Sequence, residues 1–159
     1  MTWPEPVQRV ADVLRAAAVD ARIEEFPEGT PTAREAARAV GCELAQIVKS
    51  LVFVCDGFYV LALVPGDARA DERALATAVP AASVRVATAA EVERATGFPP
   101  GGVAPFPQRD VAQTLMDEEL LRHHVVWVGA GSDRHMAALA PAELQRLARA
   151  RAFDLTGRG

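Results

Sequence analysis

The clearest candidate for chemistry is Lys49, the one lysine among 17 lysine and arginine residues. It interrupts the apolar segment Val48–Cys55 and so places an ammonium group at the start of an expected strand. A fixed positive charge at the mouth of a pocket suits a phosphate or a carboxylate. The alternative is a lysine whose stem covers the core while its amine reaches water. Ser50 is not expected to form a nucleophile pair with Lys49, because neighbouring side chains on a strand point to opposite faces.

The second candidate is the pair Gly101-Gly102, which lies in a loop over residues 98–107 that four prolines stiffen. Two adjacent glycines leave backbone amides uncovered, and rigid amides can bind an anion or a developing oxyanion. A plain tight turn is the alternative. An alanine in place of either glycine is expected to obstruct the pocket and to force an unfavourable φ.

Two weaker candidates lie near residues 129–135. Gly129-Ala130-Gly131-Ser132 is expected to form a turn after a strand. Arg134 stands where a dinucleotide-binding turn needs its third glycine, and no βαβ unit precedes it. His135 follows this turn at the edge of the next strand. A lone histidine there is usually a surface residue, although it can orient a substrate or a water molecule, because its proton moves near neutral pH.

Composition excludes several classes of protein. The net charge of −4 argues against a protein that coats a nucleic acid by charge alone, and no DNA partner is expected. Contact with a nucleic acid at a few points stays open.

Cys42 and Cys55 are expected to be unbridged thiols, and no Cys/His spacing predicts a metal site. No cofactor is expected. With neither an export signal nor a run of about 20 apolar residues, the expectation is a cytoplasmic protein that makes no membrane contact.

The elements that must position these residues alternate irregularly. Two apolar runs flank Asp56-Gly57, a strong two-residue turn, and predict a central hairpin over residues 47–64. Thr32 and Thr88, each followed three residues later by glutamate, predict two helix starts. The other expected helices cover residues 7–17, 71–78 and 141–150, with a helical turn at 117–121. The other expected strands cover residues 22–26, 84–86, 111–116, 125–129 and 135–139. This order favours an α+β fold with a mixed sheet, in a single domain over residues 1–159.

Five segments in this order resemble the YbaK and prolyl-tRNA synthetase-associated editing domain family. They are residues 32–37 (TAREAA), 47–53 (IVKSLVF), 95–105 with its Gly-Gly-Val-Ala-Pro, 126–131 (VWVGAG) and 139–144. The resemblance covers nearly the whole chain and implies a freestanding domain whose mixed, partly barrel-like β-sheet is surrounded by helices. It implies hydrolysis of the ester that joins a wrong amino acid to a tRNA, most often the tRNA for proline.

The resemblance also implies a set of site residues. Lys49 matches the family's lysine, held to contact the ribose-phosphate region of the terminal adenosine or the substrate, and Gly101 and Gly102 match the glycines whose amides approach the aminoacyl carbonyl. These three are the expected catalytic residues. The expected substrate-binding residues are Thr32, Ser50, Val103, Pro105, Gly131 and His135. The expected partner is the aminoacylated acceptor end of a tRNA, with a synthetase as a possible second partner.

A rival hypothesis from another class is a non-catalytic module that holds a nucleotide or an aminoacyl-tRNA end, or that docks on a synthetase. The hydrolytic hypothesis fits the chemistry, because an aminoacyl ester is already activated and needs only a positioned water and a stabilised oxyanion. The sequence leaves open which amino acid is removed, from which tRNA, and whether the chain forms oligomers.

Overall fold

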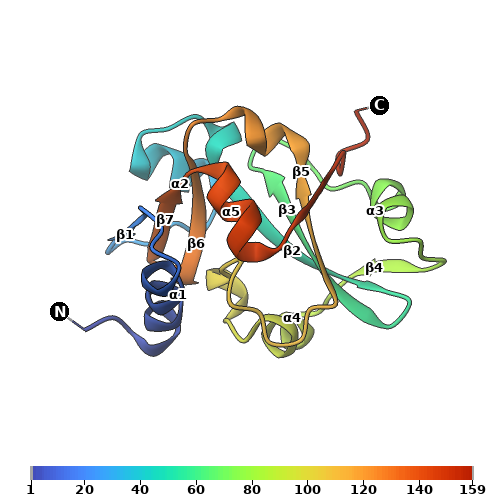
Figure 1. The fold of residues 1–159 in the computed structure, drawn as a ribbon, viewed down its shortest axis with the longest axis horizontal. Coiled ribbons are helices and arrows are strands. Elements are labelled where there is room, and N and C mark those ends of the chain that lie inside the picture. The colour runs from blue at the N-terminus through green and yellow to red at the C-terminus, as the bar shows by residue number, and fades with distance from the viewer. Residues whose placement is uncertain (1, 159) are drawn as a thin grey trace.

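The computed structural model describes residues 2–158, which form helices and strands in an irregular order (Figure 1). The α-helices are α1 (Glu5–Ala16), α2 (Ala33–Val40), α3 (Glu72–Ala78), α4 (Ala89–Thr96) and α5 (Pro141–Ala148). The strands are β1 (Arg22–Glu25), β2 (Val48–Cys55), β3 (Phe58–Pro65), β4 (Val84–Val86), β5 (Gln113–Asp117), β6 (Val126–Ser132), β7 (His135–Leu139) and β8 (Arg151–Phe153). Three short 3-10 helices are η1 (Leu44–Gln46), η2 (Pro100–Gly102) and η3 (Glu118–Arg122). The α+β class is confirmed.

Local signals set the helix ends where the sequence predicts them. The Thr32 hydroxyl accepts a hydrogen bond from the Glu35 amide at the start of α2. At the start of α4, Thr88 and Glu91 cap each other reciprocally. Both helices end at a glycine in the left-handed conformation, which costs glycine little because it has no Cβ. These caps fix the ends of the two helices that flank the candidate site residues.

The predicted hairpin is the centre of a five-stranded sheet with the order β4-β2-β3-β5-β8. β2 pairs antiparallel with β3 and β4, whereas β3, β5 and β8 run parallel, so the sheet is mixed. Asp56 and Gly57 both have positive φ, as the predicted turn requires. The hairpin prediction is therefore confirmed.

A separate antiparallel sheet has the order β1-β7-β6. It is linked to the larger sheet by an isolated bridge between Ile47 and Trp127. The barrel-like character expected of the sheet is limited to this junction, and the two sheets do not close into a barrel. The junction matters because it places the start of β2, where Lys49 lies, beside β6.

Three apolar clusters account for the layers. The main cluster lies between the two sheets and extends under α1 and α5, with Phe98 and Met116 fully buried in it. A second cluster fills the opposite face of the five-stranded sheet beneath α3, and a third packs α2 against the outer face of the smaller sheet. β2 and β3 are buried on both faces, which explains why both read as continuous apolar runs.

The structure differs from the sequence-based expectations at three places. Residues 129–132 are not a turn: β6 runs on to Ser132 through a bulge, and the chain reverses at Asp133-Arg134. β5 begins two residues later than expected, and β8 was not foreseen. Gly129 and Gly131 lie inside a strand, where the lack of a side chain lets another backbone segment approach closely. An interpretation of these glycines as turn residues misses this role.

Within residues 2–158 no helix is long and apolar enough to cross a membrane. Cys42 is partly exposed and Cys55 is buried, and both are free thiols. The pKa of each thiol is raised, mainly by burial and to a smaller extent by the adjacent carboxylate. Neither thiol is therefore activated as a thiolate at neutral pH.

Asp117 ties the end of the chain to the central sheet. Its carboxylate is fully buried, accepts the Leu155 amide at 2.9 Å, and receives the Arg158 guanidinium at 2.9 Å on both oxygens. The buried carboxylate, the Leu155 amide and the Arg158 guanidinium depend on one another. Removal of any one of them leaves the others without hydrogen-bond partners.

We expect Asp117→Ala to lower the free energy of unfolding by about 3 kcal/mol, because it strips partners from a buried amide and from Arg158. Urea titration at pH 7 measures this change. Asp12→Ala is the matched control, since Asp12 pairs with Arg15 on the exposed face of α1 and should cost about 0.5 kcal/mol. Equal losses in the two variants would contradict the anchoring role of Asp117.

Candidate functional site

A cavity of about 280 Å³ lies where the start of β2 meets η2, the start of α2 and the reversal between β6 and β7. Six of the nine predicted site residues line it: Thr32, Lys49, Ser50, Gly101, Val103 and His135. They come from four segments that are far apart in the sequence, so the fold rather than local spacing assembles them.

Lys49 is half-buried at the wall of this cavity. Its Nζ donates a hydrogen bond to the carbonyl of Ala68, in the turn that follows β3, and an ammonium group has two more protons to donate. Burial lowers the pKa of Lys49, and the nearby Arg69 lowers it further, while Asp67 acts in the opposite direction. The charge is therefore incompletely compensated, as suits a group that receives an anion.

Ser50 lies next to Lys49 but has a different environment. Its Oγ is buried and has no hydrogen-bond partner among the described residues. The two side chains leave the strand in opposite directions, and they form no Ser-Lys pair. An unpartnered hydroxyl at the wall of a cavity is a position where a ligand group or a water can be held.

The glycine turn presents one amide that its own turn does not use. Pro99 and Pro100 have no N–H, and the Gly102 amide donates to the Pro99 carbonyl at 2.8 Å. Since the first amides of a 3-10 turn have no acceptor within it, the Gly101 N–H is left over. Gly101 is exposed and lines the cavity, so this amide is the candidate oxyanion donor.

Gly102 has a different role from Gly101. A Cβ at Gly102 would lie 2.4 Å from the Ser132 Cα, whereas a Cβ at Gly101 would meet only the Asp133 Cβ at 3.6 Å. Neither glycine has positive φ, so the expected backbone strain on substitution is wrong for both. Gly102 lets the turn lie directly on the backbone of β6.

His135 is buried, unlike the surface histidine that is usual at such a position, with only 3% of its area exposed. Its Nδ1 lies 2.6 Å from the Ser132 Oγ, and its Nε2 lies 3.6 Å from the Glu25 Oε2. The Trp3 ring packs edge-on against the imidazole at 5.3 Å between centroids. The Ser132 hydroxyl also accepts the Arg134 amide, so its own proton is free for His135 Nδ1.

Three predicted site residues do not line this cavity. Gly102 and Gly131 face backbone instead: a Cβ at Gly131, where φ is +105°, would lie 2.8 Å from Pro6. Pro105 is buried and lines a different cavity, at the other end of its loop. These three residues lie behind the cavity and allow the segments around it to pack together.

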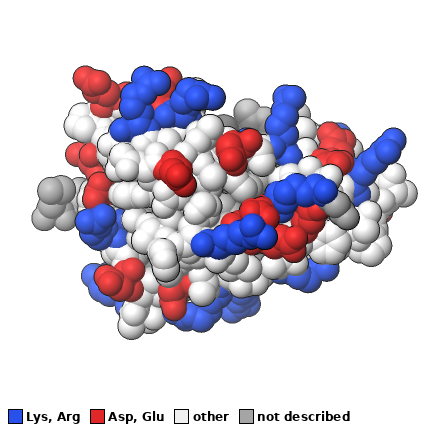
Figure 2. Space-filling model, turned by 90° about the horizontal axis from the view of Figure 1, so that it is seen from above, with Lys and Arg blue, Asp and Glu red and all other residues white. Residues whose placement is uncertain are grey.

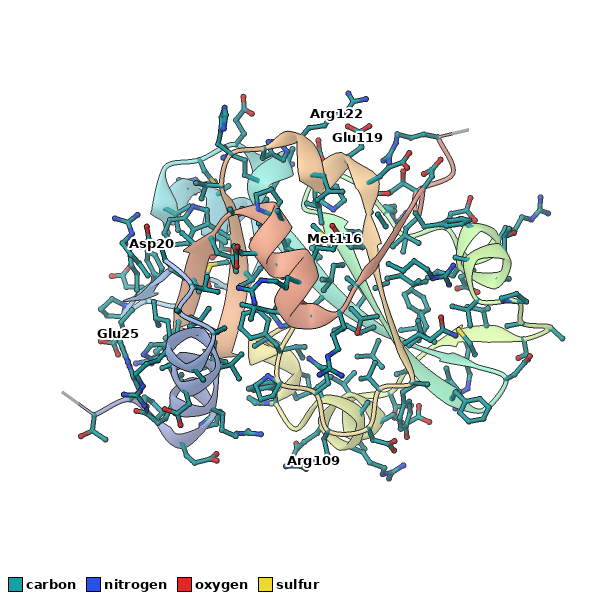
Figure 3. The ribbon with its side chains drawn as sticks, viewed as in Figure 1. Asp20, Glu25, Arg109, Met116, Glu119 and Arg122 are labelled. Carbon is teal, nitrogen blue, oxygen red and sulfur yellow. The ribbon has the colours of Figure 1, made fainter. Side chains whose placement is uncertain are left out.

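Sequence reasoning missed Ser132 and Glu25. The sequence predicts a turn at Ser132, and only the spacing of three residues between Ser132 and His135 points to a contact between them. Glu25 is opposite His135 because β1 pairs with β7, a pairing of distant segments that no local signal predicts. Glu25 extends from β1 at the edge of the molecule (Figure 3).

The charges on the face seen in Figure 2 are mixed. Seen from above, over α2, η1 and η3, basic and acidic side chains are interspersed around an uncharged area (Figure 2). Arg122 and Glu119 of η3, for example, pair at 3.5 Å (Figure 3). On this face the surface has no broad basic band, so any contact with a nucleic acid here is confined to a few groups.

A family model described as the aminoacyl-tRNA editing domain matches residues 27–147. The proline–tRNA ligase of Nitratidesulfovibrio vulgaris is 36% identical over 118 residues, which are 73% of this chain but only 21% of the ligase. EbsC of Enterococcus faecalis, named as a Cys-tRNA(Pro)/Cys-tRNA(Cys) deacylase, is 28% identical over 79% of this chain and 77% of its own length.

A solved structure described as a trans-editing enzyme for prolyl tRNA synthetase has the same fold. It is 37% identical and superimposes with a TM-score of 0.90, covering 98% of this chain and 99% of that one.

We expect the two glycines of the turn to differ on substitution. Gly102→Ala should lower the free energy of unfolding by roughly 1–3 kcal/mol, because the new methyl group collides with the β6 backbone. Gly101→Ala should leave stability within about 0.5 kcal/mol, since its methyl group has room. Thermal and urea unfolding of the two variants measure the difference. A Gly102→Ala variant as stable as the unaltered chain would contradict the close packing.

Proposed function

The chain belongs to the aminoacyl-tRNA editing domain family, and we propose that it is a deacylase that hydrolyses the ester bond of a mischarged tRNA in trans. The tRNA for proline is the proposed substrate, because relatives include prolyl-tRNA ligases and a protein named as a Cys-tRNA(Pro) deacylase. Its place of action would be the cytoplasm, where charged tRNAs are used. The observation that carries the proposal is the meeting of Lys49, Gly101 and His135 around one small cavity.

In this proposal Lys49 holds the end of the tRNA. Its two free protons can bind the phosphate or ribose oxygens of the terminal adenosine, while the Ala68 carbonyl fixes the third. An incoming phosphate compensates the positive charge that burial and Arg69 disfavour. Binding energy gained at Lys49 thus positions an ester that would hydrolyse slowly without help.

The reaction needs no protein nucleophile. A water oxygen attacks the ester carbonyl, and the Gly101 N–H donates to the carbonyl oxygen as its negative charge grows. The bond to the ribose oxygen then breaks, that oxygen takes the proton that the attacking water gives up, and a free amino acid and an uncharged tRNA leave. Thr32, Ser50 and Val103 line the space for the aminoacyl group.

His135 is proposed to shape this space rather than to move a proton. Both of its ring nitrogens face partners within the protein, Ser132 and Glu25, so the imidazole is held as a rigid wall. Gly102 and Gly131 act by letting backbones approach, and Pro105 acts by stiffening the loop.

We expect Lys49→Met to reduce single-turnover deacylation of mischarged tRNA-Pro by about tenfold or more, because a hydrogen bond to a charged group is worth roughly 1.5–3 kcal/mol. Lys49→Arg should restore only part of the rate, since a planar guanidinium does not replace a compact ammonium. The assay uses tRNA-Pro charged with cysteine and with other small amino acids, and Pro-tRNA-Pro as the correctly charged control.

Activity measured at unchanged stability separates this role from that of a lysine that merely covers the core, because the methionine side chain still covers the core. The lowered pKa of Lys49 means that the folded state disfavours its charge, so stability should rise with pH between that lowered pKa and the ordinary 10.5. Lys49→Met should lack this rise and should be no less stable at pH 7. Full activity in Lys49→Met would overturn the site, and binding of charged tRNA without hydrolysis by the unaltered chain would favour a non-catalytic module.

A further inference from the structure

Ser50 is a polar residue on an apolar face of the central sheet. Its side chain lies on the same face of β2 as those of Val48 and Val52, because side chains two residues apart on a strand point the same way, and both valines belong to the main core. Leu63, opposite Ser50 on β3, is fully buried in that core. The apolar packing of this face therefore does not explain why a hydroxyl stands here.

The Ser50 hydroxyl has no partner in the free protein. Its Oγ is buried, and within residues 2–158 it forms no hydrogen bond. Buried hydroxyl groups are usually hydrogen-bonded, because a group that has lost its water and gained no partner raises the free energy of the folded state. Ser50 also lines the cavity of about 280 Å³ at the start of β2, so a ligand group in that cavity can supply the missing partner.

The backbone of Ser50 faces an open edge of β2. The Val52 carbonyl accepts the amide that follows β4, on the side away from β3. In an antiparallel strand the backbone groups of residues two apart point to the same side, so the Ser50 amide and carbonyl also point away from β3. On that side β4 pairs only with the end of β2, and the bridge to β6 lies at Ile47. The stretch between these two contacts includes residues 48–51, which line the cavity.

The wall of the cavity is not acidic. Within the part of the chain that the structure describes, no aspartate or glutamate lines it, although the Asp133 side chain starts beside Gly101. An aminoacyl ester carries an α-amino group next to its reacting carbonyl, and this group finds no carboxylate on the wall. The Ser50 hydroxyl is both a donor and an acceptor, so it can bind the amino group in either protonation state.

We propose that Ser50 binds the α-amino group of the aminoacyl ester and thereby turns the ester carbonyl toward the Gly101 amide. This inference rests on the proposed deacylase function and names the part of the substrate that Ser50 recognises. Gly101 lines the same small cavity from η2, so both groups can contact one aminoacyl group. Ser50 orients the substrate and takes no part in bond breaking.

The consequence is a preference for esters that have a free α-amino group. An ester without that group leaves the Ser50 hydroxyl unpartnered in the complex, and a site that keeps a buried polar group unpaired discriminates against such a ligand. The rival occupant of this position is a polar side chain of the substrate, such as the thiol of a cysteinyl ester.

The test uses two matched pairs of esters on tRNA-Pro, alanyl with propionyl and cysteinyl with mercaptopropionyl. The second member of each pair lacks only the amino group. Single-turnover hydrolysis is measured at saturating protein, and each rate is divided by that of spontaneous hydrolysis, because the amino group also activates the ester chemically. We expect the unaltered chain to prefer the amino ester of each pair about fivefold or more, the effect of one hydrogen bond.

In Ser50→Ala this preference should disappear, through slower hydrolysis of the amino esters and unchanged hydrolysis of the other two. Urea unfolding should show Ser50→Ala to be at least as stable as the unaltered chain, since the lost hydroxyl had no partner. Ser83→Ala is the matched control, because Ser83 is exposed and lies outside the cavity, where its carbonyl accepts the Asp56 amide at the hairpin turn. It should keep the full preference.

The proposal is overturned if Ser50→Ala keeps the preference for amino esters, if it slows all four esters equally, or if it is markedly less stable than the unaltered chain. It is also overturned if Ser50→Ala changes only the preference for cysteinyl over alanyl esters, or if Asp133→Asn rather than Ser50→Ala removes the preference for the amino group. An unaltered chain that hydrolyses none of the four esters would instead overturn the deacylase function on which the proposal rests.

Discussion

The close approach of the glycine turn to β6 is the contact on which the site depends. A Cβ at Gly102 would lie 2.6 Å from the Ser132 nitrogen, and a Cβ at Gly129 would lie 2.6 Å from the Val103 carbonyl oxygen. The backbones of the glycine turn and of β6 therefore meet with no side chain between them. Each of the two segments has a glycine at the point where the other segment contacts it. This contact places the Gly101 amide beside the cavity and holds Ser132 in line with His135. Any larger residue at either position would push the turn away from the strand and open the site.

The sequence predicts the parts of this fold that are determined locally. The hairpin at Asp56-Gly57 and the caps at Thr32 and Thr88 each satisfy their own backbone groups within a few residues, so their signals can be read from short windows. The stretch 129–132 could not be predicted in this way. Its glycines look like a turn because turns are the commonest reason for such spacing, whereas here they are required by Val103 and Pro6, which are distant in the sequence.

The candidate site also has some features that the local sequence predicts and others that depend on distant segments. Lys49 could be found because a charge inside an apolar strand is a local anomaly, and Gly101 because it belongs to a glycine pair in a proline-stiffened loop. The resemblance to a family assigned roles to them and to His135. The environment of His135 could not be found, since its burial and its contact with Glu25 arise from the pairing of β1 with β7, more than 100 residues apart. The composition gives the numbers of basic and acidic residues, but it does not show which arginines form ion pairs with carboxylates.

That last distinction separates Arg158 from Lys49. Arg158 is surrounded by Asp117, Glu119 and Asp154, and its charge serves to hold the end of the chain on the sheet. Lys49 is fixed by a neutral acceptor, the Ala68 carbonyl, and it forms no ion pair within residues 2–158. A half-buried positive charge without a carboxylate partner is unfavourable because burial removes its water, and an anion that approaches it relieves this cost. The protein can therefore be acidic overall and still bind phosphate, provided that each cation is placed in a cavity where the anion displaces water and approaches it directly.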